Sequence, residues 1–370
     1  MDFINASFQD AVFENGYMWV FDNLIQAICK IDTDNFQMEI ISGYQGREKF
    51  LAHKIVLFEE KFYLLSRIST NVLIYDRKKE GKDSAFFLQE SQVEDRAIKY
   101  VAFFLYNNCI YFFPHNINKE ILCFNIISRK FLKKSGLGVH FKGKGTKTDL
   151  FMRSCNFYEG VMWFVIDAAG SYGTYNITNG EVKIFQSEHT KAIFGGICFD
   201  GEDVWLIKEN SNEVICEGKK TIQLIEEQSH SEIHLVREGI IVTPFMSDIV
   251  MFIPKNTSAV SLFKLPLIEK EKEEVINHYY CSNENFVYLL PLSTGPIFVF
   301  DTKTLELKRV KIKCKNYIER CLKDRKILVK EDEDIHFENF LQFCECTSKL
   351  KNEQEKNEIE MGKIIWETVQ

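Results

Sequence analysis

Ionisable side chains recur near the beginning of short apolar segments in this sequence. Four of them are of types that bind or transform charged ligands: His53, Arg153, Glu232 and His278. Imidazole and carboxylate groups can exchange protons with a substrate, and a guanidinium group can hold a carboxylate. If the segments lie side by side, these groups form a polar site of mixed charge that fits a carboxylate, a sugar or the end of a peptide. The plainer interpretation is four solvated side chains with water between them.

Two further residues, Arg67 and His115, follow the next apolar segment of their own units, and we expect them at the rim of the same site. The matching positions elsewhere hold Asp167, Lys208 and Asp248. No nucleophile elbow, glycine-rich dinucleotide motif or kinase motif set occurs in the sequence. The sequence therefore identifies no catalytic residues, and it favours a binding protein over an enzyme without excluding the enzyme.

A basic, glycine-rich stretch spans residues 133–147, and Lys142, Lys144 and Lys147 lie in it. Glycines leave backbone N–H groups accessible, and lysines can neutralise a phosphate or carboxylate. The stretch lacks the Gly-Lys-Ser/Thr ending of a nucleotide-binding loop. These lysines are our candidates for an anion-binding loop, and the alternative is a solvated loop with no ligand.

Metal ligands are not indicated by the histidine and cysteine spacings. His230 and His234 are four residues apart, which on a strand separates them by about 13 Å, too far to share one ion. Cys344 and Cys346 lack a second pair to complete four ligands. We predict no metal and no cofactor.

Composition excludes several classes of protein. The net charge is −7, with 53 acidic against 46 basic residues, which argues against nucleic acid as a partner. No apolar run reaches the roughly 20 residues of a membrane helix. The 11 cysteines are scattered without a CxxC pair, and the first residues do not resemble a signal peptide. These features predict a cytoplasmic protein.

The elements that must position these side chains are indicated by an internal repeat. Seven apolar segments follow a turn and centre on a marker residue: Trp19, Tyr63, Tyr111, Trp163, Trp205, Ile241 and Tyr288. A second apolar segment ends 12 to 14 residues after each marker in a turn residue: Asp32, Asp76, Asn125, Asn176, Glu217, Pro254 and Asp301. The markers are 36 to 52 residues apart. Because the separation between the two markers stays nearly constant seven times, the sequence indicates one structural unit repeated along the chain.

Each unit has the contents of four short antiparallel strands joined by tight turns. Stacked four-stranded sheets of this size are the blades of a β-propeller, which cover one another's faces. The sequence therefore predicts an all-β, seven-bladed propeller, or six blades if the first or sixth unit is a distorted remnant. The first strand of each blade would line the central channel, where the ionisable groups would meet. Counting five residues back from the end of each first strand gives the expected channel residues Gln9, His53, Val101, Arg153, Phe194, Glu232 and His278.

The aromatic second strands and the turns at Tyr75-Asp76, Tyr175-Asn176 and 300–304 resemble bacterial propellers of the kelch, TolB-like and quinoprotein-like groups. The resemblance covers residues 5 to 313 and is specific for architecture. The double glycine of true kelch repeats occurs only as Gly195-Gly196, and the Trp-Asp pairing of WD repeats is missing.

The repeat ends near residue 313, which predicts a propeller over 1–313 and an extension over 314–370. The extension has the apolar spacing of amphipathic helices that pack on the propeller or on a partner. Phe340 and Trp366 are its candidate partner-binding residues. The whole pattern favours a non-enzymatic scaffold that binds a protein, a peptide or a glycan through its loop face. The alternative is a hydrolase, lyase or cyclase acting on a sugar or peptide at the channel mouth.

Overall fold

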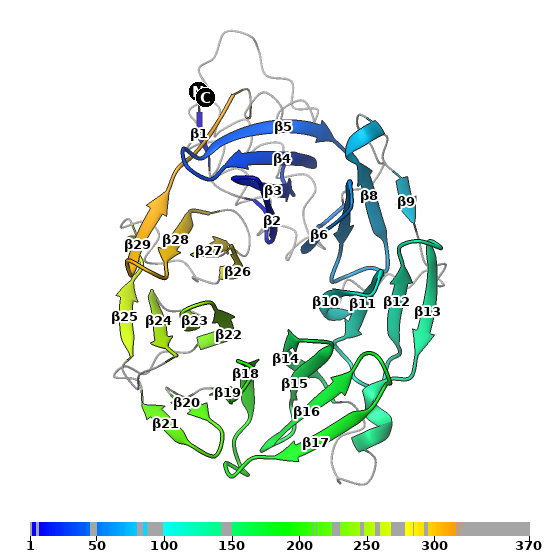
Figure 1. The fold of residues 1–370 in the computed structure, drawn as a ribbon, viewed down its shortest axis with the longest axis vertical. Helices are drawn as coiled ribbons and strands as arrows, with labels where there is room; N and C mark the ends of the chain where they lie inside the picture. The colour runs from blue at the N-terminus through cyan, green and yellow to red at the C-terminus, as the bar shows by residue number, and fades with distance from the viewer. Residues whose placement is uncertain are drawn as a thin grey trace, which may run out of the picture. The chain divides into compact units, whose positions relative to one another are not determined.

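The computed structural model divides the chain into two compact units, one of Asn5–Ile312 and one of Met1–Ile4 with Lys313–Gln370. It describes residues 2–4, 7–44, 50–79, 84–86, 99–141, 150–209, 211, 213–223, 230–244, 248–255, 260–267, 278–283, 285–291, 295–315 and 317. The larger unit is a ring of seven four-stranded antiparallel sheets, which confirms the seven-bladed propeller (Figure 1).

Each blade is built from consecutive strands, the first nearest the centre of the ring and the fourth at its outer edge (Figure 1). Blades 1 to 3 are β2 (Ala11–Glu14), β3 (Tyr17–Asp22), β4 (Ala27–Asp32), β5 (Gln37–Gly43); β6 (Lys54–Phe58), β7 (Lys61–Leu65), β8 (Val72–Asp76), β9 (Ser84–Phe86); β10 (Tyr100–Tyr106), β11 (Cys109–Pro114), β12 (Ile121–Asn125), β13 (Lys130–Lys134). Blades 4 and 5 are β14 (Met152–Tyr158), β15 (Val161–Ile166), β16 (Ser171–Asn176), β17 (Val182–Gln186); β18 (Phe194–Phe199), β19 (Val204–Lys208), β20 (Glu213–Cys216), β21 (Lys220–Gln223). Blades 6 and 7 are β22 (His230–Val236), β23 (Gly239–Pro244), β24 (Ile249–Pro254), β25 (Ser261–Lys264); β26 (His278–Ser282), β27 (Phe286–Pro291), β28 (Ile297–Asp301), β29 (Glu306–Val310).

All seven marker residues lie on second strands; six of the paired turn residues end third strands, and Glu217 follows directly after the third strand β20. The turn residues are required because their side chains hold the following turn. Asp32 Oδ1 accepts hydrogen bonds from the backbone N–H groups of Asp34 and Asn35, at 2.9 and 3.0 Å. Asp301 does the same for Lys303 and Thr304, at 2.8 and 3.2 Å. A carboxylate or amide that caps the third-to-fourth hairpin explains the near-constant spacing of the two markers.

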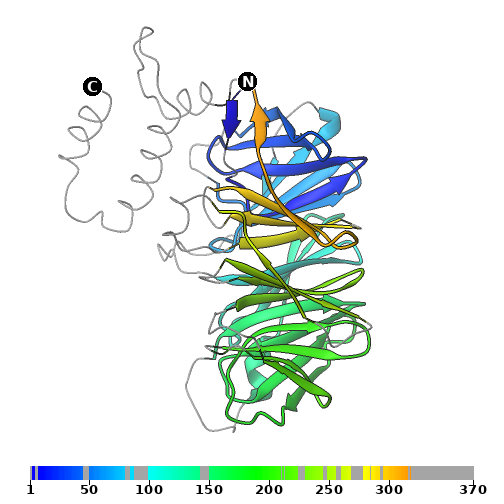
Figure 2. The ribbon, with the colours of Figure 1, turned by 90° about the vertical axis from the view of Figure 1, so that its left-hand side faces the viewer.

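The core lies between neighbouring blades, where the faces of their sheets meet. Trp163 of the fourth blade stacks on Phe199 of the fifth, with ring centroids 4.4 Å apart. Phe13 and Tyr288 are 4.8 Å apart and join the first blade to the seventh, so ring contacts of the same kind close the ring. The strands of each blade cross one another with the usual twist, which lets adjacent sheets pack face to face (Figure 2). The high aromatic content of the sequence therefore serves contacts between blades.

Four of the innermost strands carry a β-bulge at their beginning. The pairing register shifts between Tyr100 and Ala102 in β10, and between Met152 and Ser154 in β14. The same shift occurs near the start of β18 and of β22. A bulge leaves one residue unpaired and changes which face the following side chains occupy. The entrance of the channel is therefore irregular at these four blades.

The described part of the smaller unit includes β1 (Asp2–Ile4) and most of β30 (Ile312–Cys314). Two short 3₁₀ helices, η1 (Arg77–Lys79) and η2 (Leu137–Phe141), belong to the larger unit. Phe340 and Trp366 lie outside the described residues, as do the helices expected over 314–370 beyond residue 317. Among the described residues, no helix has the length and apolar character to cross a membrane.

Candidate functional site

The beginnings of the innermost strands surround the axis of the ring, and we call this end of the channel the channel mouth (Figure 1). It includes Asp10 before β2, His53 and Lys54 at the start of β6, and Glu232 in β22. Arg67 follows β7 and reaches the same region, because its charge acts on His53 of its own blade and on Glu232 of the sixth. Acidic and basic groups from several blades therefore share the mouth.

Asp10 and Lys54 form an ion pair between the first and second blades. Lys54 Nζ donates to Asp10 Oδ1 at 3.0 Å, and the backbone N–H of Ile55 donates to Oδ2 at 2.9 Å. The Asp10 side chain is 6% exposed, whereas that of Lys54 is 40% exposed. Burial raises the pKa of Asp10, and the charge of Lys54 and the hydrogen bond from Ile55 offset part of that rise. Each oxygen of the buried carboxylate thus accepts a hydrogen bond.

Glu232 is the acidic group on the opposite side of the mouth. Its Oε2 lies 3.2 Å from His234 Nε2 on the same face of β22. Burial raises the pKa of Glu232, but the contact with His234 and the charges of Arg67 and Lys54 outweigh it, so the pKa lies below its ordinary value. Glu232 is consequently a carboxylate at neutral pH. The His234 ring stacks on Tyr280 of β26 at 3.9 Å, nearly parallel, which fixes the imidazole against the seventh blade.

His53 is held by the backbone on one side of its ring. Its Nδ1 lies 3.0 Å from the carbonyl oxygen of Leu51 and 3.2 Å from the backbone nitrogen of Arg67. Burial, and then the charge of Arg67, lower the pKa of His53 to about 4. The imidazole is therefore neutral at pH 7. Its Nε2 makes no hydrogen bond with a residue that the structure describes.

Arg153 and His115 take different positions at the mouth. Arg153 is the bulge residue of β14, and its Nη1 lies 3.2 Å from Glu209 Oε1 of the fifth blade in an exposed ion pair. His115 follows β11, and its Nδ1 lies 3.1 Å from the carbonyl oxygen of Met152. Its ring packs against Phe151 at 5.0 Å. Arg153 thus faces solvent at the rim, whereas His115 joins the third blade to the fourth.

An open hollow of about 580 Å³ lies along the innermost strands of the first three blades and reaches the end of β26 in the seventh. Most of its lining residues are apolar, although polar atoms form nearly half of the exposed lining; the residues are Ala11, Val12, Phe13, Lys54, Ile55, Val56, Leu57, Phe103, Phe104, Leu105, Ser282 and Asn283. Lys54 therefore borders both the charged mouth and this hollow. A ligand that fits this arrangement has a charged or polar end and an apolar portion.

The predicted residues reach this region to different degrees. The structure brings Arg67 within electrostatic reach of both His53 and Glu232, and it places Arg153 at the rim. His278 begins β26, but its side chain lies outside the described part of the chain. Lys142, Lys144 and Lys147 also lie outside the described residues.

Sequence reasoning missed Asp10, Lys54 and His234 as members of the mouth. Asp10 and Lys54 each adjoin a residue that the repeat did place at the channel, so one more position per strand would have included them. His234 was considered only as a metal ligand. Among the described residues, no group of histidine, cysteine and carboxylate side chains is arranged to hold a metal ion.

Comparison with known proteins identifies the fold and no family. No protein-family model and no curated protein matches the sequence. The solved structure of YCF48 bound to D1 peptide has a TM-score of 0.58 at 10% identity, over 81% of this chain and 95% of that one. A catalytically inactive virginiamycin B lyase from Staphylococcus aureus, with quinupristin, gives 0.56 at 11%, over 79% and 92%. KlAtg21 in complex with the coiled coil of AgAtg16 gives 0.51 at 11%, over 82% and 98%. These likenesses confirm the propeller, which in these proteins accompanies both a lyase and binding partners.

Proposed function

We propose that this protein is a binding propeller that holds a peptide segment of a partner protein in the channel mouth. The observation that carries the proposal is the change from charged to mostly apolar lining residues at Lys54, between the mouth and the hollow of about 580 Å³. A peptide combines polar backbone groups, charges and apolar side chains, so it matches both regions at once. Arg67 would hold an acidic group of the peptide, and Glu232 a basic one.

The ionisation of the mouth supports binding over acid–base catalysis. A general acid or base works best when its pKa is near the working pH. The pKa of His53 is lowered to about 4, and that of Glu232 lies below its ordinary value. Burial also raises the pKa of the nearby Cys155 to about 12, which keeps it a thiol, a poor nucleophile. Fixed charges of this kind suit recognition.

Selection of a displayed random peptide library on the full chain tests the proposal. We expect enriched peptides that carry both charges and apolar residues. Calorimetry with one synthesised peptide should show about tenfold weaker binding to Arg67→Met and to Glu232→Gln. Lys183→Met is the matched control, because Lys183 lies on the outer strand β17, is exposed and pairs with Glu181. It therefore removes a lysine charge without changing the channel mouth. Lack of enrichment, or equal binding by all three variants, would contradict the proposal.

His53 favours a second candidate function, an enzyme acting on a sugar or peptide at the same mouth. Its neutral ring lies within reach of the positive charge of Arg67, and its Nε2 makes no hydrogen bond within the described residues. A lyase or hydrolase needs such a polar group next to a cation that stabilises negative charge. Turnover of a peptide or oligosaccharide that is lost in His53→Gln, with peptide binding retained, would support the enzyme.

We also propose that the protein works in a reducing compartment such as the cytoplasm. The eight cysteines within the described residues are free, and six of them are buried in the sheets. A buried thiol behaves as a small apolar side chain and has no need of a disulfide partner. If the protein is isolated from its host and then denatured without a reductant, alkylation should therefore label all 11 cysteines. Fewer labels would indicate disulfides.

A further inference from the structure

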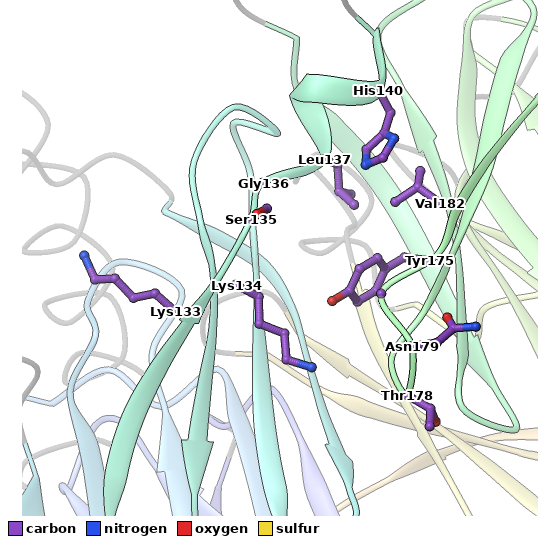
Figure 3. A pocket seen from close by; sticks show the side chains of 11 residues that line it. Lys133, Lys134, Ser135, Gly136, Leu137, His140, Tyr175, Thr178, Asn179 and Val182 are labelled. Carbon is purple, nitrogen blue, oxygen red and sulfur yellow. The ribbon is translucent and has the colours of Figure 1, made fainter.

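A second hollow, which we call the flank pocket, lies where the outer parts of the third and fourth blades meet (Figure 3). Its volume is about 400 Å³. One wall is the end of β13 with the segment that continues through η2, and the other is the hairpin between β16 and β17. The lining residues are Lys133, Lys134, Ser135, Gly136, Leu137, His140, Tyr175, Thr178, Asn179, Gly180 and Val182.

The charge of this lining is opposite to that of the whole chain. The protein carries a net charge of −7, but the lining has two lysines and a histidine and no carboxylate. Two acidic residues lie close to this lining. Glu120 lies 2.9 Å from Nζ of the lining residue Lys133 and offsets its charge, whereas Glu181 lies 3.3 Å from Nζ of Lys183, outside the lining, so the uncancelled lysine charge is that of Lys134. The pocket is therefore a basic site on an acidic protein, which favours an anion.

Lys134 supplies the central charge of the flank pocket. Its Nζ donates to the carbonyl oxygen of Ile177 at 3.2 Å and lies 5.0 Å from the centre of the Tyr111 ring. Both partners are neutral, so they orient the ammonium without cancelling its charge. An ammonium has three N–H donors, and the carbonyl uses one. Figure 3 shows Lys134 and Tyr175 extending toward one another at the pocket.

Two more side chains offer hydrogen bonds to a ligand. Ser135 and His140 are exposed, and neither makes a hydrogen bond with a residue in the described part of the chain. The His140 ring lies beside Leu137 and Val182 in Figure 3, so a polar group and an apolar wall adjoin. A ligand with an anionic group and a small apolar body would contact both.

The walls are fixed before any ligand binds. A side chain at Gly136 would place its Cβ 2.3 Å from the carbonyl oxygen of Lys119, so only glycine allows this segment to pass. Leu137 is 1% exposed and packs in the core. On the other wall, Asn176 Oδ1 accepts the backbone N–H of Thr178 at 2.9 Å and shapes the hairpin. A preformed site loses less conformational entropy on binding.

We propose that the flank pocket binds a small organic phosphate monoester. Lys134 contacts the phosphate beside Tyr175, and the organic part extends along the pocket toward Leu137, Val182 and His140 (Figure 3). A phosphate presents three terminal oxygens, so it can accept a donor from the ammonium group and from the Tyr175 hydroxyl at the same time. A planar carboxylate is better matched by the two-pronged guanidinium of arginine, and the lining contains no arginine.

Calorimetric titration with phenyl phosphate tests the pocket. We expect saturable binding to the full chain that weakens about tenfold in Lys134→Met and severalfold in His140→Gln. Tyr175→Phe keeps the test informative if Lys134→Met fails to fold, because it removes only the hydroxyl that lies beside Lys134 and should still weaken binding severalfold (Figure 3). Lys308→Met, at an exposed lysine of β29 in the seventh blade, is the matched control for a lost surface charge and should bind as the unchanged protein does.

Three results would overturn the proposal. The first is no binding at phenyl phosphate concentrations up to about 10 mM, which corresponds to an affinity too weak for a built site. The second is equal weakening by Lys308→Met, which would mean general attraction of anions. The third is benzoate binding as tightly as phenyl phosphate. Glu232→Gln, at the channel mouth, should leave phenyl phosphate binding unchanged, so failure of the peptide proposal and failure of this one are separable.

Discussion

Lysines occupy both the channel mouth and the flank pocket, but their partners differ. Lys54 in the mouth lies 3.0 Å from a carboxylate that is 6% exposed. Lys134 in the flank pocket is held by a carbonyl oxygen and an aromatic face. A lysine paired with a buried carboxylate contributes to stability, whereas one oriented by neutral groups keeps a charge that a ligand can use. The comparison therefore separates a charge that stabilises the fold from a charge that remains available to bind.

The largest expected difference comes from removing the carboxylate of the mouth. Asp10→Ala should lower the free energy of unfolding by about 3 kcal/mol, because Lys54 and the N–H of Ile55 lose a buried acceptor. Urea denaturation measures the loss. Lys134→Met is the comparison variant and should lose about 1 kcal/mol. Equal losses would break the distinction between the two lysines.

A glycine of the flank pocket should have the next largest effect. Gly136→Ala should cost about 2 kcal/mol, because its Cβ would meet the backbone oxygen of Lys119 at 2.3 Å. It should also weaken phenyl phosphate binding, since the wall must move. The control is Gly180→Ala, where φ is 74° and the added Cβ meets nothing within 4 Å, so the cost is about 1 kcal/mol. A tolerated Gly136→Ala, judged by thermal unfolding, would show that the wall is adaptable.

The pH dependence of stability should report His53 in the mouth. Its pKa is about 4 in the folded protein against 6.5 ordinarily, so the unfolded chain takes up the proton first as the pH falls. The free energy of unfolding should then decrease from pH 6.5 toward pH 4, by at most about 1.4 kcal/mol per pH unit. Denaturation at pH 6.5 and 5.5, before most carboxylates titrate, should show a shallower slope in His53→Asn. Identical slopes would mean that His53 is not buried as a neutral ring.

The smallest effect on stability should come from the rim. Arg153 and Glu209 are 41% and 31% exposed, so solvent screens their attraction. Arg153→Ala should change the free energy of unfolding by less than about 0.5 kcal/mol. A loss comparable with that of Asp10→Ala would show that the rim pair is part of the structural network of the mouth.

Much of the fold could be predicted from the sequence because the residues that define the repeat interact mainly with residues close to them along the chain. Trp19, Tyr63 and the other markers lie on second strands, since each blade needs a bulky apolar residue to fill the gap to its neighbour. Asp32 and Asp301 recur because each caps its own hairpin within three residues. Such interactions depend on neighbours along the chain, which a single sequence displays.

The channel residues were harder to predict because counting along a strand assumes an unbroken register. The bulge in β14 makes Arg153 an unpaired residue at the rim. In β18 the same count selects Phe194, which is fully buried between blades, although a channel residue was expected there. In β22 it selects Glu232, one residue beyond the bulge. The counted residue is thus the bulge residue in β14, the residue before the bulge in β18 and the residue after it in β22, so the count does not select equivalent positions.

By itself, the sequence determined the all-β class, the seven units and the turns that separate their strands. The tertiary structure decided which charges meet: Asp10 with Lys54 across 44 residues, and Lys134 with the Ile177 carbonyl across 43. It also made the flank pocket, whose walls come from separate blades. The physical reason is the separation along the chain of the residues that interact. Hairpins form from residues a few positions apart, whereas sites between blades depend on the angle and register at which whole sheets pack.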